Sequence, residues 1–316
     1  MEIKKVLITD YVHPLLMIKF RQLGFHPVYA PEIKLDVVHA VISSFHGIVI
    51  NTKIKTDRTL LEKGLQLKFV ARLGSGKDII DLDAADQLGI NIITSPEGNR
   101  NAVAEHAMGM LLSLANKINQ GDQEVRAFQW NREKNRGFEL EGKTIGIIGF
   151  GNTGRAFAEK FESWKTSVLS YDKYKERYAE DLRFVTETNL AEIQEKADVI
   201  SFHLPLTEET KHMVDKDFLA KCQKGVMLLN TSRGKVMDEN AVIEALTLGQ
   251  VSGLCMDVFE NEQVHSFSKE EKAKYEVLFG FKNTVFTPHV AGWTVESKRK
   301  IAETIIEKVK SSFRAD

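Results

Sequence analysis

The chain has 316 residues, which exceeds the usual size of one domain, so we expect two lobes with a core each. Its 43 lysines and arginines nearly balance its 44 aspartates and glutamates, which excludes the basic field that attracts nucleic acid or an anionic membrane. The first apolar run is too short for a signal peptide, and no stretch approaches the roughly 20 apolar residues of a membrane span. We therefore expect a cytoplasmic protein with no nucleic-acid or membrane partner.

Short β-rich runs alternate with helical patterns through the first part of the chain. The predicted strands are Lys5–Thr9, Pro27–Tyr29, Gly47–Ile50, Leu67–Arg72 and Asn91–Thr94, and the predicted helices are Pro14–Leu23, Leu35–Ser43 and Leu82–Leu88. This alternation is typical of a parallel sheet with helices on its faces. We expect this lobe to run to about Ser95, followed by a broadly apolar helix from Asn101 to Asn119 that is covered on most sides.

A second set of strands follows the polar stretch Arg126–Gly137. Its predicted members are Thr144–Gly149, Ser167–Tyr171, Val199–His203, Val226–Asn230, Gly253–Val258 and Thr284–Thr287. Helical patterns separate most of them, which predicts a second doubly wound parallel sheet and an α/β fold class for the whole chain. The last segment, Thr294–Phe313, is an amphipathic helix that we expect to pack back on the first lobe.

Two cysteines, Cys222 and Cys255, lie in or beside apolar segments and lack the spacing of metal ligands. This pattern predicts buried, inert thiols and no metal site.

A glycine-spaced turn, Gly149-Phe150-Gly151-Asn152-Thr153-Gly154, joins the first strand of the second set to a helical run. In that context Gly149 permits the tight turn, Gly151 lets the backbone approach a pyrophosphate, and Gly154 allows close packing of helix on strand. A glycine-rich turn without a ligand is the alternative. Strand, turn and helix in this order favour a dinucleotide site.

Asp172 ends the next strand, where the acid that binds the adenosine ribose belongs. Its carboxylate would repel a 2′-phosphate, which favours NAD over NADP, although Lys173 and Lys175 follow closely and weaken that preference. His203 and the Asn230-Thr231-Ser232 stretch also follow strands, and we expect both to face the same crevice. For His203 the alternative is equally well supported: an ordinary polar loop residue that binds no ligand.

Three further polar residues, Arg233, Glu262 and His289, follow later strands of the same sheet. An arginine fork can hold a substrate carboxylate or reach a carbonyl oxygen. An imidazole can give a proton to a nascent alkoxide, and a carboxylate on its other nitrogen favours its charged form. Each residue alone also fits an ordinary loop or surface position. Together they indicate hydride transfer between a 2-hydroxy acid and a 2-oxo acid, with Glu260 as a second candidate for the carboxylate.

These motifs resemble the D-isomer-specific 2-hydroxyacid dehydrogenases, a family that includes 3-phosphoglycerate dehydrogenase and glyoxylate/hydroxypyruvate reductases. The matching stretches are Leu73–Asp78, Gly98–His106, the glycine turn, His203–Thr207, Asn230–Gly234, Asp257–Glu262 and Thr287–Thr294. The resemblance implies a Rossmann NAD-binding domain, residues 98–288, inserted in a flavodoxin-like substrate-binding domain, residues 1–97 and 289–316. It also implies NAD-dependent D-2-hydroxyacid dehydrogenase activity on a small 2-hydroxy or 2-oxo acid.

The resemblance implies Arg233, Glu262 and His289 as the catalytic residues, and it selects Glu262 over Glu260. The residues expected to bind the cofactor are Ser75, Gly149, Gly151, Asn152, Thr153, Gly154, Asp172, His203, Leu204, Thr231, Ser232 and Asp257, the last beside the nicotinamide amide. The residues expected to bind substrate are Asn51, Leu73, Gly74, Ser75 and Gly76, together with Arg233 and His289. The family also implies lobes that close on the substrate and a homodimer formed through the NAD-binding domains.

The sequence departs from the family at two places. Asn51-Thr52-Lys53 stands where phosphoglycerate-type relatives commonly carry arginine, which weighs against a phosphorylated substrate unless Lys53 takes that role. Gln263 stands directly after Glu262, where many relatives have proline, so the segment from there to Asn283 departs from the family pattern. Two alternative functions stay open: a corepressor-like protein that senses NAD(H), and a formate-type dehydrogenase, against which Glu262 argues.

Overall fold

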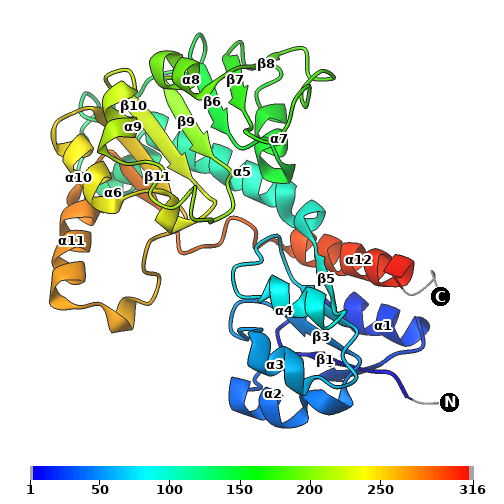
Figure 1. Ribbon diagram of the computed structural model, residues 1–316. Helices are drawn as coiled ribbons and strands as arrows, with labels where there is room; N and C mark the ends of the chain where they lie inside the picture. The colour runs from blue at the N-terminus through cyan, green and yellow to red at the C-terminus, as the bar shows by residue number, and fades with distance from the viewer. Residues whose placement is uncertain (1–2, 313–316) are drawn as a thin grey trace. The chain divides into compact units, whose positions relative to one another are not determined.

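The computed structural model describes residues 3–312, which form two compact units (Figure 1). The first unit runs up to Arg100 and resumes at Gly292, and the second comprises Asn101–Ala291. Residues 98–100 thus group with the first unit and residues 289–291 with the second, whereas the sequence prediction divides the chain before residue 98 and before residue 289.

The first unit is a parallel sheet in the strand order β2-β1-β3-β4-β5, with helices on both faces. Its strands are β1 (Lys5–Ile8), β2 (His26–Tyr29), β3 (Gly47–Ile50), β4 (Phe69–Arg72) and β5 (Asn91–Thr94). Its helices are α1 (Pro14–Gln22), α2 (Leu35–Val41), the 3-10 turn η1 (Ile42–Ser44), α3 (Arg58–Lys63), α4 (Leu82–Gln87) and α12 (Val295–Ser312). This strand order is that of the flavodoxin-like fold, which confirms the prediction.

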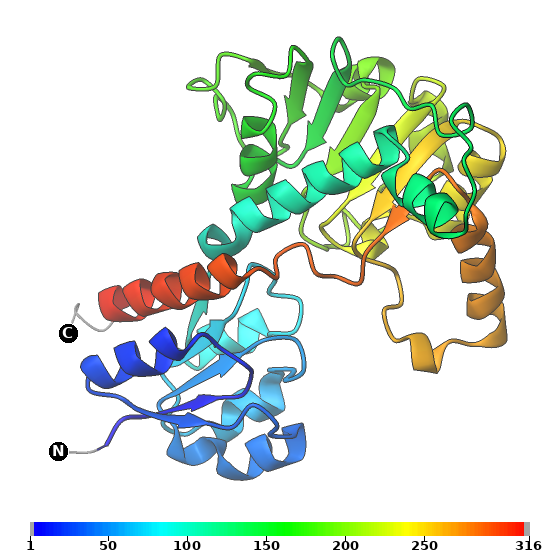
Figure 2. The same cartoon turned by 180° about the vertical axis from the view of Figure 1, so that it is seen from behind.

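The two faces of this sheet are covered by different helices because side chains alternate along each strand. Helices α2, α3 and α4 cover one face, and α1 and α12 cover the other, where Phe20 stacks on Phe69 with ring centroids 6.2 Å apart. Figure 2 shows α12 lying beside α1. Lys308 on α12 donates to the Thr94 carbonyl at 2.8 Å. The prediction that the C-terminal helix packs on the first lobe is confirmed.

The second unit is a parallel sheet in the order β12-β11-β10-β9-β6-β7-β8. Its strands are β6 (Thr144–Ile148), β7 (Ser167–Tyr171), β8 (Val185–Glu187), β9 (Val199–Phe202), β10 (Val226–Asn230), β11 (Val251–Met256) and β12 (Thr284–Phe286). The helices are α5 (Pro96–Ala115, which begins in the first unit), α6 (Ile118–Arg126), α7 (Asn152–Glu159), α8 (Leu190–Lys196), α9 (Lys216–Lys221), α10 (Glu239–Thr247) and α11 (Lys269–Gly280), with 3-10 turns η2 (Gly234–Val236) and η3 (Val264–Ser266). The order reverses between β6 and β9, as in the predicted Rossmann fold.

Two hydrophobic layers enclose this second sheet. Helices α5 and α7 cover one face, and α8, α9, α10 and α11 cover the other. As predicted, α5 is buried over a wide arc, with Ala104 and Leu111 almost fully covered. The predicted helix Asn101–Asn119 is wrong at its end, because Lys117 adopts a left-handed conformation with φ 51° and separates α5 from α6.

Both cysteines are buried, as predicted, and burial raises the pKa of Cys222 to about 12 and also raises that of Cys255. No group of three or more histidines, cysteines or acidic residues within residues 3–312 could hold a metal ion. In the same range no helix is long and apolar enough to cross a membrane.

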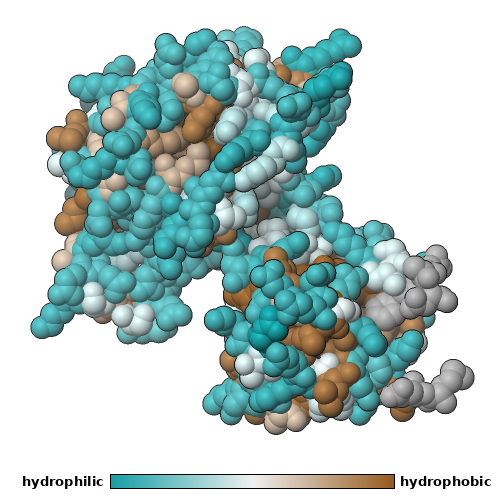
Figure 3. All heavy atoms as spheres, in the orientation of Figure 1, coloured by the Kyte–Doolittle hydropathy of each residue, from teal (hydrophilic) through white to brown (hydrophobic). Residues whose placement is uncertain are grey.

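The face in Figure 3 is mostly hydrophilic on the second unit and carries more hydrophobic residues on the first.

Candidate active site

The glycine turn lies at the carboxyl end of β6, next to the point where the strand order reverses. A side chain at Gly149, whose φ is +89°, would meet the His203 carbonyl at 2.4 Å, and one at Gly154 would meet the Gly149 carbonyl at 2.1 Å. A side chain at Gly151 would meet no protein atom within 4 Å. Gly149 and Gly154 are therefore required by packing, whereas Gly151 leaves an open approach to the backbone.

The amides of Asn152 and Thr153 begin helix α7 directly after this open glycine. A helix N-terminus with exposed amides attracts phosphate. Just after β10, which is separated from β6 by β9, the Thr231 hydroxyl is buried without a hydrogen-bond partner, which is costly unless a ligand supplies one. These features fit a dinucleotide, with its phosphates on the α7 amides and a polar group against Thr231.

Asp172 directly follows β7, and its side chain reaches back to the glycine turn. Its carboxylate accepts from the Phe150 amide at 2.9 Å and from the Tyr174 amide at 3.1 Å. The two lysines that follow it have other partners: Lys173 pairs with Glu209, and Lys175 donates to the Phe150 carbonyl at 2.9 Å. Asp172 is therefore the acid beside the turn, and both lysine ammonium groups are engaged.

His203 lies beneath the turn, and its side chain has protein contacts. Its ring is within hydrogen-bond distance of the Ser201 hydroxyl at 2.8 Å and packs on Phe157, with ring centroids 5.4 Å apart. Burial lowers the pKa of His203 to about 3, so the imidazole is neutral at physiological pH. Leu204 next to it borders Gly149. The His203 side chain thus has a structural role in the second unit.

Arg233, Glu262 and His289 come from the ends of β10, β11 and β12, which are neighbours in the sheet. His289 Nδ1 lies 2.8 Å from a Glu262 carboxylate oxygen. Burial raises the pKa of Glu262, but the hydrogen bond to His289 and the charges of His289 and Arg233 outweigh it and lower that pKa below its ordinary value. The structure therefore pairs the predicted histidine with the predicted carboxylate, within the electrostatic range of the arginine.

His289 has an unusual backbone. Its φ of 55° is left-handed, a conformation that costs a non-glycine residue free energy and often occurs at functional sites. The buried carboxylate of Asp257 holds this turn, accepting from the Thr287 hydroxyl at 2.5 Å, the Val290 amide at 2.9 Å and the Ala291 amide at 2.8 Å. Asp257 thus fixes the turn that carries His289, a set of contacts that the sequence did not predict.

The Ser232 loop is also fixed by local hydrogen bonds. The Asn230 side chain accepts from the Ser232 amide at 3.0 Å and donates to the Arg233 carbonyl at 2.9 Å. Arg233 Nη1 donates to the Ser232 carbonyl at 2.7 Å. These contacts explain why a small polar stretch precedes the arginine: it turns the chain sharply after β10.

The predicted substrate residues of the first unit follow β3 and β4, which are adjacent strands. Arg72 links the two loops, donating to the Asn51 side chain at 2.6 Å and to the Leu73 carbonyl at 2.8 Å. The Leu73 amide donates to Ile50 and the Gly74 amide to Ser95. Within residues 3–312, the amides of Ser75 and Gly76 donate to no backbone carbonyl.

A small cavity of about 40 Å³ adjoins these loops. Asn51 and Leu73 line it, together with Tyr11, Val12, His13, Gly292, Trp293, Ser297, Lys298, Ile301 and Ala302. Sequence reasoning missed Tyr11 and His13. Their position after β1, the neighbour of β3, was the signal that could have found them, because carboxyl ends of adjacent parallel strands meet at one edge.

His106 is another residue that the sequence reasoning did not assign. It lies on α5, and its Nε2 is 2.9 Å from the Thr287 hydroxyl and 3.6 Å from Asp257. It therefore belongs to the group of side chains behind the His289 turn.

Known proteins share both the sequence and the fold of this chain. Residues 108–291 match the NAD binding domain of the D-isomer specific 2-hydroxyacid dehydrogenases. The chain is 32% identical over 282 residues to a hydroxypyruvate reductase of Thermotoga maritima, with 89% of each covered. A D-lactate dehydrogenase from Aquifex aeolicus, solved with NAD and lactic acid, is 28% identical with a TM-score of 0.84, covering 99% of this chain and 96% of that one.

Longer relatives match as well. The chain is 30% identical over 313 residues to a D-3-phosphoglycerate dehydrogenase of Methanocaldococcus jannaschii, which covers 99% of this chain but only 58% of that protein. The fold, the glycine turn and the histidine–carboxylate pair define a nicotinamide dinucleotide-binding protein of the dehydrogenase type. The chain belongs to the D-isomer-specific 2-hydroxyacid dehydrogenase family.

Substitutions of Gly154 and of Gly151 in the glycine turn are expected to have opposite effects. Gly154→Ala should lower the melting temperature, because its methyl would meet the Gly149 carbonyl at 2.1 Å. Gly151→Ala should melt like the wild type and bind NADH roughly tenfold more weakly or worse, because the methyl obstructs only the ligand. Thermal melting and NADH fluorescence titration check both. Unchanged NADH affinity in Gly151→Ala would contradict the assignment.

The buried, neutral His203 should make the stability of the folded protein sensitive to acid. The unfolded chain binds a proton at this histidine near pH 6.5, whereas the folded chain does so only at about pH 3, so stability is lost as the pH falls between those values. The loss from this residue is about 1.4 kcal/mol per pH unit below 6.5. Urea unfolding at pH 7 and pH 5, at fixed protein concentration, should show a smaller difference for His203→Gln than for the wild type. The exposed His265→Gln serves as control, and equal pH dependence in all three proteins would refute the argument.

Proposed function

We propose that this chain catalyses the NAD-dependent interconversion of a small D-2-hydroxy acid and its 2-oxo acid. The observation that supports this most strongly is the 2.8 Å contact between His289 Nδ1 and Glu262 at the ends of adjacent strands of an NAD-binding sheet. A paired imidazole is suited to general acid–base catalysis at a carbinol or carbonyl oxygen.

Each residue of the trio has a distinct role in the proposed reaction. In the reducing direction, His289 Nε2 gives its proton to the substrate's carbonyl oxygen, since Nδ1 faces Glu262. Glu262 stabilises the protonated imidazole, and Arg233 binds the substrate and offsets the negative charge that develops on oxygen. Bound NADH supplies the hydride that adds to the carbonyl carbon. The proton and the hydride together convert C=O into CH–OH.

We infer a preference for NAD over NADP from the surroundings of Asp172. A carboxylate at this position accepts from ribose hydroxyls and repels a 2′-phosphate. The neighbouring lysines are engaged by Glu209 and by the Phe150 carbonyl, so neither ammonium group faces a 2′-phosphate without giving up a contact. This arrangement removes the main argument against NAD that the sequence raised.

The first unit supports a small, unphosphorylated acid. The amides of Ser75 and Gly76 would bind the carboxylate, since backbone donors in a glycine-rich loop suit an anion. The cavity beside Asn51 is small, about 40 Å³, and aromatic and aliphatic side chains line it together with His13, Ser297 and Lys298. Lys53, which could have bound a phosphate, donates to the Pro31 carbonyl. These features favour a methyl or hydroxymethyl group on the acid.

The two alternative functions have less support. A formate-type dehydrogenase does not need a carboxylate on the histidine, yet Glu262 is paired with it here. A protein that only senses NAD(H) needs neither the pair nor the strained His289 backbone. Consumption of NADH distinguishes the enzyme from the sensor.

We also propose a homodimer formed through the NAD-binding unit. The side chains of Ile118, Val125, Phe128 and Trp130, on α6 and the segment after it, are between 52% and 100% exposed. Large exposed apolar side chains that lie close together along one segment are typical of a protein interface.

The activity is tested by mixing NADH with glyoxylate, pyruvate, hydroxypyruvate or phosphohydroxypyruvate and following absorbance. We expect turnover of at least one unphosphorylated acid, and slower turnover with NADPH. His289→Ala and Arg233→Ala should each lower kcat/KM by about 10²–10⁴-fold without lowering the melting temperature. The exposed His265→Ala should match the wild type. Wild-type rates in either active-site variant would disprove the assigned roles.

The dimer is tested by mass in solution. The double variant Phe128→Asp with Trp130→Asp should sediment as a monomer at concentrations where the wild type is a dimer, because charges on the proposed interface oppose association. Leu65→Asp, on the first unit and 83% exposed in the wild type, should leave the mass unchanged. A monomeric wild type, or a double variant that stays dimeric, would rule out this interface.

A further inference from the structure

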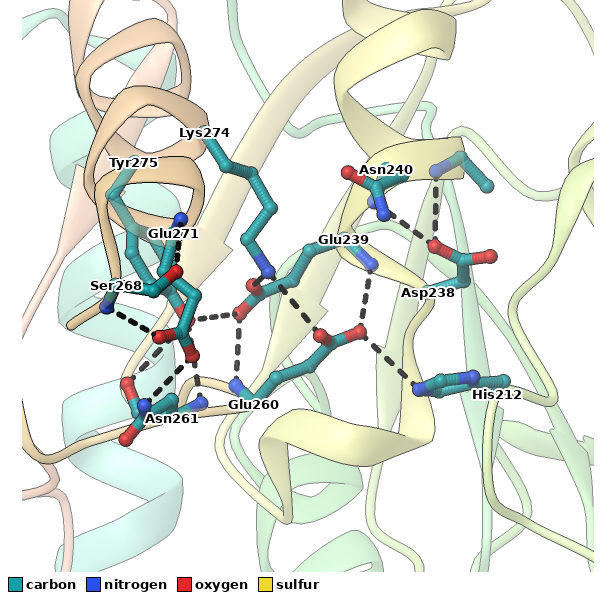
Figure 4. A network of polar contacts seen from close by, with 11 residues as sticks. His212, Asp238, Glu239, Asn240, Glu260, Asn261, Ser268, Glu271, Lys274 and Tyr275 are labelled. Atoms are coloured by element: carbon teal, nitrogen blue, oxygen red, sulfur yellow. Dashed lines mark hydrogen bonds and ion pairs between the residues drawn. The ribbon is translucent and has the colours of Figure 1, made fainter. Parts of the chain in front are cut away.

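The loop that carries Glu262 lies between two helices that take no part in the proposed chemistry. Figure 4 shows a polar network in which side chains of α10 and α11 converge on Glu260 and Asn261, the two residues immediately before Glu262. The family resemblance implies Glu262, not Glu260, as the catalytic carboxylate. The structure provides a different role for it.

Glu239 and Glu260 bind each other's backbone. The Glu260 amide donates to the Glu239 carboxylate at 2.8 Å, and the Glu239 amide donates to the Glu260 carboxylate at 3.1 Å. Glu239 is the first residue of α10 and only 1% exposed. The reciprocal pair therefore ties the loop to the start of a buried helix.

Two carboxylates this close require a compensating charge, and Lys274 on α11 supplies it. Its ammonium lies 2.5 Å from Glu239 and 3.2 Å from Glu260, and its side chain is only 16% exposed. Burial alone would lower the pKa of Lys274, but the contacts with the two glutamates raise it above its ordinary value. His212 approaches Glu260 at 3.2 Å from the exposed side. Lys274 is thus the cation that joins both carboxylates.

Tyr275, the next residue of α11, holds Asn261. Its hydroxyl accepts from the Asn261 amide at 3.3 Å, and the Asn261 side chain donates to Glu271 at 2.8 Å. The Tyr275 ring also contacts Phe259 with centroids 5.9 Å apart. Consecutive residues 259 to 261 are therefore each held by α11, through ring, charge or hydroxyl.

The network reaches the catalytic pair through the backbone. The Phe259 amide donates to one oxygen of Glu262 at 3.3 Å, while the other oxygen faces His289. Any movement of residues 259–261 would shift that amide and the Glu262 backbone together. A contact of 2.8 Å weakens steeply with small displacements, and misplacement by about 1 Å can cost about 10²-fold in rate.

We propose that Lys274 and Tyr275 are positioning residues, which hold Glu262 against His289 through Glu239, Glu260 and Asn261. This inference rests on the proposed function for its kinetic effect, but the contact between Glu262 and His289 can be measured without turnover.

The test compares Lys274→Met, Lys274→Arg and Tyr275→Phe with the wild type. The proposed reduction uses a proton held by His289, so kcat/KM in the reducing direction should fall on the alkaline side of the pH profile. Lys274→Met should lower kcat/KM roughly tenfold and move this fall to lower pH by about half a unit, toward the profile of Glu262→Gln. Lys274→Arg should restore most of both, and Tyr275→Phe should change both in the same direction by less.

Lys272→Met is the matched control, because Lys272 lies on the same helix and is exposed. It should equal the wild type in rate and pH profile. A melting curve shows whether each variant is folded. If Lys274→Met does not fold, Tyr275→Phe, which loses only a hydroxyl, decides the question: a wild-type rate and profile would overturn the proposal, as would a folded Lys274→Met with a wild-type profile.

A second readout separates this proposal from the proposed activity. The titration of His289 is followed by NMR in histidine-labelled protein, with the signal assigned by its loss in His289→Gln. The midpoint should lie at lower pH in Lys274→Met and in Glu262→Gln than in the wild type. If no acid is reduced but this difference is found, the positioning role stands and the proposed activity fails. An identical titration in the wild type and a folded Lys274→Met overturns the positioning role.

Discussion

The buried carboxylate of Asp257 fixes the turn that carries His289, and the proposed chemistry depends on that turn. Three donors, one hydroxyl and two backbone amides, bind this carboxylate, and the His289 amide donates to the Asp257 carbonyl at 2.7 Å. A polar group that is only 1% exposed needs such hydrogen-bond partners to compensate for its lost hydration. These contacts offset the cost of a left-handed histidine, and they aim its imidazole at Glu262.

The parallel sheet explains why residues so far apart in sequence converge. Every strand pair in the second unit is parallel, so each strand ends at the same edge. The order β12-β11-β10 places His289, Glu262 and Arg233 in the loops that follow three consecutive strands, and β6 with β7 on the far side of β9 places the glycine turn beside Asp172. The switch in strand order therefore lies between the glycine turn and the loops that carry Arg233, Glu262 and His289.

Much of this arrangement could be predicted from sequence because its signals are local. Strand, glycine turn and strand-end acid identify the Rossmann half, and the 3.6-residue pattern identifies α12. Contacts between distant residues could not be predicted in this way. The hydrogen bonds of Asp257 with residues 287–291 and the ion pair between Lys274 and Glu239 depend on side-chain directions. The spacing of residues in the sequence does not encode these directions. The left-handed Lys117, which divides a continuous helical pattern, also lacked a glycine or proline to mark it.

The pair of His289 and Glu262, for which we propose a catalytic role, is thus supported from two sides by different interactions. His289 is held by a single buried anion that accepts from backbone, whereas Glu262 is held by a mixed-charge network and aromatic packing contributed by α10 and α11. Both supports start from β11, because Asp257 directly follows its last residue and Phe259 lies two residues further. The end of one strand therefore orients both members of the pair. Their 2.8 Å separation can change only through movement of the short segments that lead away from that strand end.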